Sequence, residues 1–116
     1  MLAAMTRWPV LVVMLIGASA GAAEPVQVIT AEDWARPRSG ESLVQMPALK
    51  RTVRAYLGDG EQRIVIRHPD GEEGVLWAEE LRGWLVALGV PSEDVSVSAD
   101  SSRVDAIELE VTAAPQ

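Results

Sequence analysis

The chain has 116 residues, no cysteine and a formal net charge of −7, with 17 acidic residues against 10 lysines and arginines. A chain of this length forms one domain, and without cysteine it has no disulfide bond to stabilise it. The acidic balance, with no dense basic cluster, excludes nucleic acid as an expected partner because the phosphate backbone would be repelled.

Residues 1–23 have the three parts of a bacterial export signal. Arg7 gives the first part its positive charge, an apolar run follows at 10–16, and residues 17–23 contain only Gly, Ala and Ser. The apolar stretch is shorter than the roughly 20 residues that a membrane-spanning helix needs. We therefore expect cleavage at the end of this segment, localisation in the periplasm, and no membrane span in the mature protein.

The stretch 24–41 is predicted to be a weakly ordered N-terminal segment. Val26 and Val28 alternate with other residues as in a short strand, but the sequence Arg-Pro-Arg-Ser-Gly at 36–40 interrupts regular structure. Trp34 lies in this irregular stretch, where packing in the core constrains the choice of residue less. Two interpretations of Trp34 remain open: it covers the open end of a sheet, or it anchors a protein partner.

Two helices are predicted in the domain that spans 42–112, which a loose tail at 113–116 follows. The first helix covers 47–57, and the second lies between Gly74 and Gly89. Apolar residues of the second helix recur at helical spacing, and we expect this stripe to face the core. The stripe consists of Trp77, Leu81, Trp84, Leu85 and Leu88.

Three strands are predicted around these helices. Residues 63–67 are β-branched between charged ends, which indicates a central strand buried on both faces. Segments 95–98 and 107–111 alternate apolar and polar residues, and the linker 100–103 is short enough for a hairpin between them. With the strand near Val28 the order is β-α-β-α-β-β. We predict an α+β fold, a two-layer α/β sandwich with both helices packed on one face of a mixed sheet.

This order and several local sequences resemble the OmpA-like domain, the periplasmic peptidoglycan-associating module of Gram-negative envelopes. The clearest similarity lies at 84–96, where a helix ends in an aromatic–Leu pair that Gly-Val-Pro and a strand follow. Residues 107–111 resemble the family's last strand, and 63–70 resemble its central strand and the turn that carries an aspartate. The resemblance covers about 42–112 and implies the fold, the periplasm and peptidoglycan as a ligand.

The resemblance also indicates which residues would bind the ligand. In that family an aspartate in the turn and an arginine before an alanine on the second helix hold the diaminopimelate of the stem peptide. Asp70 stands at the aspartate's position, whereas Trp77, before Ala78, stands at the arginine's. Without a guanidinium there is no bidentate partner for the ligand's carboxylate. Asp70 and its neighbours Arg67 and His68 are therefore weak candidates for ligand contacts.

Enzymatic chemistry is not expected. His68 is the single histidine of the chain, it is predicted to be exposed at the end of a strand, and it lacks the further groups that catalysis requires. One histidine with scattered carboxylates also lacks the spacing of a metal site, so we expect neither a metal nor a cofactor. Asp70 lies in Pro-Asp-Gly, a sequence that favours a turn whatever its function.

Two functions remain open. The chain is a periplasmic envelope accessory that associates with peptidoglycan through Asp70, Arg67 and His68, or it is a protein–protein interaction module that kept the fold and lost that site. Basic residues gather within 36–54 and acidic ones from Glu72 onward. This asymmetry would turn the basic end toward an anionic envelope surface. The simpler interpretation is a solvated helix face.

Overall fold

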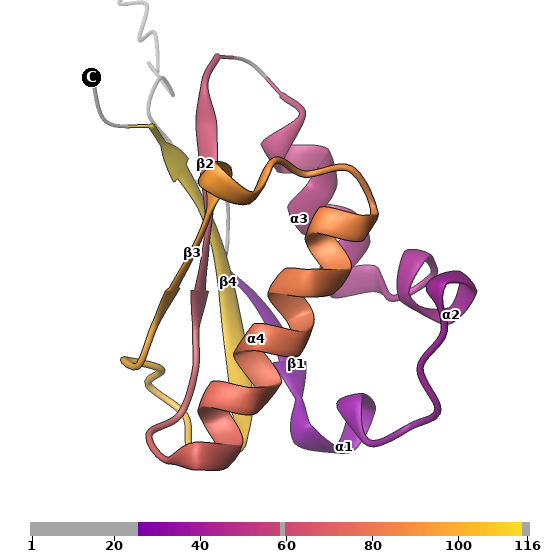
Figure 1. The fold of residues 1–116 in the computed structure, drawn as a ribbon, viewed down its shortest axis with the longest axis vertical. Coiled ribbons are helices and arrows are strands. Elements are labelled where there is room, and N and C mark those ends of the chain that lie inside the picture. The colour runs from indigo at the N-terminus through magenta and orange to yellow at the C-terminus, as the bar shows by residue number, and fades with distance from the viewer. Residues whose placement is uncertain (1–25, 59, 115–116) are drawn as a thin grey trace, which may run out of the picture.

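A computed structural model describes residues 26–58 and 60–114. They form a four-stranded mixed sheet with helices along one face, so the predicted α+β class and mixed sheet are confirmed (Figure 1). The expected export signal, residues 1–23, lies outside the described residues. The elements in chain order are β1 (Gln27–Thr30), α1 (Ala31–Trp34), α2 (Gly40–Val44), α3 (Pro47–Tyr56), β2 (Gln62–Arg67), α4 (Glu72–Ala87), the short 3₁₀ helix η1 (Ser92–Asp94), β3 (Val95–Ser98) and β4 (Ala106–Ala113).

The strands lie in the order β1-β4-β2-β3. β2 and β3 are parallel, and α4 is the crossover between them, whereas β4 is antiparallel to both β1 and β2. The predicted hairpin between the last two strands is therefore wrong, because β4 crosses over to lie between β1 and β2. The reason is burial. β4 is long and carries the buried Ile107 and Leu109, whereas β3 is short and half serine, which suits an edge.

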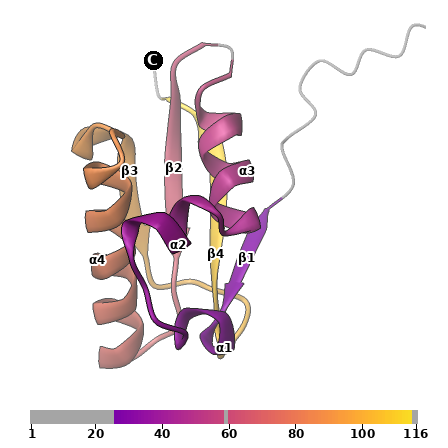
Figure 2. The same cartoon turned by 90° about the vertical axis from the view of Figure 1, so that its right-hand side faces the viewer.

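Of the segment 24–41, for which the sequence predicts weak order, the described part forms β1 and α1 and reaches the start of α2. β1 pairs with β4, and Ile29 belongs to the core. Side-chain oxygens cap both short helices: the Thr30 hydroxyl accepts from the backbone N–H of Asp33, and Ser39 and Ser42 form a capping box. The chain thus turns back over the sheet on the side of α3 and α4 (Figure 2).

The core lies between the sheet and the helices. α3 contacts β1, β4 and β2, and α4 contacts β3 and β2. The largest side chains of the core that are fully buried come from every strand except β3 and from three of the helices: Ile29, Leu43, Leu49, Ile64, Ile66, Leu81, Leu85, Ile107 and Leu109.

The buried stripe of α4 differs from the one that the sequence predicts. Leu81 and Leu85 are buried as expected, but Leu88 is 39% exposed. Trp77 and Trp84 are only partly buried. The other buried positions of the helix are Gly74 and Ala78. The reason is that small residues let the first half of α4 approach the sheet closely, which turns the larger indoles to the flank of the helix.

β2 is a central strand, as predicted, but the prediction that both of its faces are buried is wrong. Ile64 and Ile66 are fully buried beneath the helices, whereas Val65 on the opposite face is only partly covered. The helices of the described residues pack on one face of this sheet. The other face is therefore lined by polar groups, among them an ion pair between Arg67 and Glu110.

Candidate functional site

The three candidate ligand residues at the end of β2 point in different directions. Arg67 lies on the open face of the sheet, His68 lies beneath the helices, and Asp70 is exposed in the following turn. Successive side chains of a strand point to opposite faces, so Arg67 and His68 cannot share one site. The structure therefore does not bring these three groups together.

Arg67 is already neutralised by carboxylates of the same face. Its Nη1 donates a hydrogen bond to Glu110, and its Nε lies 3.5 Å from a carboxylate oxygen of Asp100. The hydrogen bond to Glu110 raises the pKa of Arg67 above its ordinary value, with smaller contributions from neighbouring acids. A ligand carboxylate would have to displace these partners before it could bind Arg67.

His68 is 4% exposed, so its predicted exposure is wrong. It shares the covered face of the sheet with Ile66 and Ile64, two and four residues earlier. The period-2 pattern of the strand indicates this shared face but not that helices cover it. Nδ1 of His68 lies 2.8 Å from the carbonyl oxygen of Pro69, which can only accept a hydrogen bond. This contact holds the ring against the turn, with Nδ1 as the donor in the tautomer that carries its proton there.

No cation of the described residues forms an ion pair with Asp70; the arginine ion pairs there all involve other carboxylates. The turn is also closed onto α4. A Cβ placed on Gly74 would lie 2.0 Å from the carbonyl oxygen of Pro69 and 3.2 Å from Nδ1 of His68. The turn backbone and α4 therefore leave no room for a ligand group between Pro69 and Gly74.

Trp77, which the sequence resemblance aligns with an arginine of the OmpA-like family, packs against the N-terminal segment. Its ring stacks on Trp34 with centroids 6.1 Å apart and planes at 27°. Its Nε1 is buried without a hydrogen-bond partner in the described part of the chain. The indole thus supplies an apolar contact to Trp34.

A cation–aromatic cluster joins α4 to the segment after α1. The guanidinium of Arg38 lies 4.6 Å from the ring centroid of Trp34 and donates to both oxygens of Glu80, at 2.8 and 3.1 Å. Trp84 Nε1 donates to the same carboxylate. These hydrogen bonds lower the pKa of Glu80, and the bond from Arg38 has the largest effect.

Trp34 itself is 8% exposed, so its ring covers the end of the core and leaves little surface for a partner.

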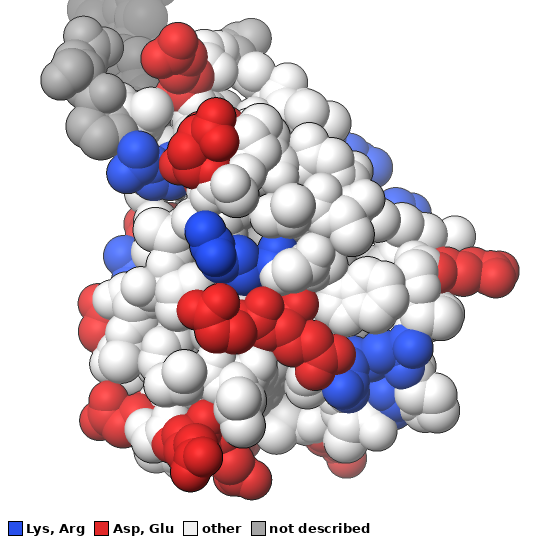
Figure 3. All heavy atoms as spheres, viewed as in Figure 1, with Lys and Arg blue, Asp and Glu red and all other residues white. Residues whose placement is uncertain are grey.

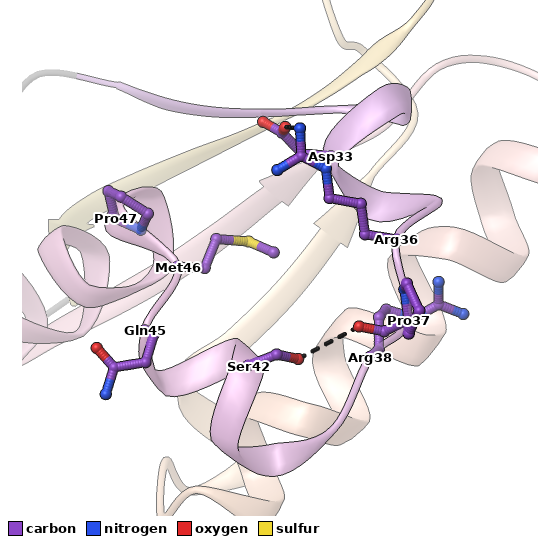
Figure 4. A pocket seen from close by; sticks show the side chains of 8 residues that line it. All are labelled: Asp33, Arg36, Pro37, Arg38, Ser42, Gln45, Met46 and Pro47. Carbon is purple, nitrogen blue, oxygen red and sulfur yellow. Dashed lines mark hydrogen bonds and ion pairs between the residues drawn. The ribbon is translucent and has the colours of Figure 1, made fainter.

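A pocket of about 350 Å³ lies beside this cluster, between α1, α2 and the start of α3 (Figure 4). At one side Arg36 pairs with Asp33 at 3.7 Å, and Ser42 bonds to the carbonyl oxygen of Pro37. Four of the labelled residues are thus paired with one another, whereas Arg38 bonds to Glu80 and to the backbone of Trp34. The sequence analysis did not predict this pocket. The feature that could have indicated it is the pair of prolines, Pro37 and Pro47, on either side of α2. It is lined by Asp33, Arg36, Pro37, Arg38, Ser42, Gln45, Met46 and Pro47.

The two long helices present different outward faces. That of α3 is basic, with Lys50, Arg51 and Arg54 exposed and no acid on the helix. That of α4 carries exposed apolar and small residues, and Leu76 is 63% exposed. In the orientation of Figure 1 this surface shows uncharged side chains on both sides of a band of charged groups (Figure 3). We call it the α4 face, which consists of Val75, Leu76, Gly83, Val86 and Ala87 with the charged Glu79 and Arg82.

In the described part of the chain, no helix is both long enough and apolar enough to span a bilayer. Nor do three or more His, Cys, Asp or Glu side chains converge there as a metal site would require. No protein-family model matches this chain, and no curated protein or solved structure matches it. Its function is therefore inferred from its own residues and their arrangement.

Proposed function

We propose that this chain is a non-enzymatic protein–protein interaction module of the bacterial cell envelope, exported to the periplasm, whose OmpA-like fold does not hold peptidoglycan. The export signal expected at residues 1–23 and the sequence resemblance over 42–112 support the compartment and the family. The position of the binding surface is argued from the helices, as follows.

The observation that carries the proposal is the apolar outward surface of α4. A helix at the surface of a small domain ordinarily has one apolar stripe toward the core and charged residues opposite, as α3 has. α4 instead buries Ala78, Leu81 and Leu85 and also exposes Val75 and Leu76 on other sides of the helix. α4 also carries five charged side chains, so its exposed apolar residues form a patch and not a whole circumference. A patch of exposed apolar side chains on a helix favours contact with another protein.

The candidate peptidoglycan contacts favour the same conclusion. Arg67 is paired, His68 is buried and Asp70 has no cation partner among the described residues. A diaminopimelate group carries a carboxylate and an amine, so its recognition needs both an anion and a cation in one cradle. Asp70 alone offers only the anion.

Two measurements test this proposal. In the first, the purified protein is sedimented with isolated cell-wall sacculi, beside an Asp70→Ala variant. We expect the protein to stay in the supernatant in both cases. Co-sedimentation that the D70A substitution abolishes would overturn the proposal and restore the peptidoglycan function.

In the second, a photoreactive amino acid replaces Leu76 in the cells that make the protein. Val104, which is 92% exposed in the connection before β4, is the matched control position. We expect a discrete covalent adduct with a protein from position 76 and none from position 104. Equal labelling from both positions would mean that the α4 face is ordinary surface.

A further inference from the structure

One side of the α4 face has a symmetrical sequence. Val75, Glu79, Arg82 and Val86 follow one another at intervals of four, three and four residues, which places them on one stripe of the helix. The stripe has the same spacing in either direction, with a valine at each end and opposite charges in the middle. Such a stripe is complementary to its own copy turned end to end.

We propose that the α4 face binds the same face of a second copy of this protein, with the two α4 helices antiparallel across a twofold axis. This inference rests on the proposed function and names the partner. In this arrangement Glu79 of each copy meets Arg82 of the other. Val75 of each copy meets Val86 of the other, so each contact occurs twice, as in any symmetric dimer interface.

The stripe is accessible on the molecule. α4 packs over β2 and β3, and β3 is an edge of the sheet. In Figure 2, α4 lies at the β3 side, and α2 and α3 lie on its other side. Val75 and Val86 are both exposed, and the side chains of Glu79 and Arg82 are partly exposed. None of these four residues is required for the packing of the core.

The charges favour a second copy over a different protein. Two copies of a chain with net charge −7 repel each other in general, but this stripe holds one acid and one base and is locally neutral. Within one copy the two groups lie 4.0 Å apart, a weak contact three residues apart on an exposed helix. Each can therefore exchange its neighbour for the matching group of the second copy, while the valines lose contact with water.

Charge reversal tests the proposal directly. Sedimentation equilibrium is measured for the wild-type protein, for Glu79→Arg, for Arg82→Glu and for an equimolar mixture of the two variants. We expect a wild-type dimer, association weakened about tenfold or more in each single variant, and its recovery in the mixture, because only mixed dimers restore both opposite-charge contacts. A wild-type protein that is monomeric at every concentration, or a mixture no more associated than its components, would overturn it.

The antiparallel register has its own measurement, which the absence of native cysteine makes simple. Val75→Cys and Val86→Cys proteins are oxidised separately and together. We expect a disulfide-linked dimer mainly in the mixture, because identical positions lie about 16 Å apart along antiparallel helices, eleven residues at 1.5 Å each. Efficient crosslinking of either variant alone would contradict this arrangement.

Failure of this inference differs from failure of the proposed function. A monomeric protein whose position 76 crosslinks to a protein of different mass would exclude the dimer and retain the interaction module. A protein that binds sacculi through Asp70 would exclude the module itself.

Discussion

Replacement of Gly74 by alanine tests how tightly the turn after β2 is closed onto α4. Helix propensity alone favours alanine over glycine by about 1 kcal/mol within a helix. The new Cβ, however, would lie 2.0 Å from the carbonyl oxygen of Pro69 and 2.9 Å from its carbon, whereas real Cβ atoms keep at least 3.0 Å from such neighbours. Backbone must therefore move by roughly 1 Å, against a buried histidine, and overpacking of this kind costs about 1–3 kcal/mol. After the gain in propensity, we expect Gly74→Ala to lower the free energy of unfolding by up to about 2 kcal/mol.

Gly83→Ala is the matched control in the same helix, because no atom lies within 4 Å of its added Cβ. We expect it to raise the free energy of unfolding by up to about 1 kcal/mol. Urea unfolding followed by tryptophan fluorescence measures both variants, at one low protein concentration so that self-association does not contribute. If Gly74→Ala proves as stabilising as Gly83→Ala, the turn is not closed, and the argument against a ligand cradle beside Pro69 fails.

Two further outcomes are expected from the contacts around α4 and β4. Trp34→Ala removes a buried indole that stacks on Trp77 of α4. We expect it to lower the free energy of unfolding by about 3 kcal/mol in the same urea assay. A loss below about 1 kcal/mol would mean that the ring does not cover the core. Hydrogen bonds lower the pKa values of two carboxyl groups: one from Arg38 acts on Glu80, and those from Ser102 act on Glu108. The ionised carboxylates therefore stabilise the fold fully above their ordinary pKa of 4.5, and this stabilisation is lost as the pH falls below it. Thermal unfolding between pH 7 and pH 3 should show this decrease, and Arg38→Gln should make it shallower; an unchanged slope in that variant would contradict the role of Arg38.

Local patterns in the sequence predicted the long elements well. Apolar residues at helical spacing with Pro47 and Gly89 as boundaries indicated α3 and α4, and alternation indicated β3 and β4. These features depend on neighbours within a few residues, which is why sequence is sufficient for them. That Trp77 stands in place of a cation stays a prediction, because it depends on the resemblance alone.

Only the tertiary structure decided which strands pair and which faces are covered. Alternation shows that residues 64, 66 and 68 share a face but does not show that helices cover it, so the burial of His68 was missed. The position of β4 between β1 and β2 depends on contacts between residues far apart in the chain, and no local pattern encodes them. The exposed apolar residues of α4 have the same origin: the sequence shows apolar residues interspersed with charged ones along the helix, and packing against the sheet determines which of the apolar residues are left without cover.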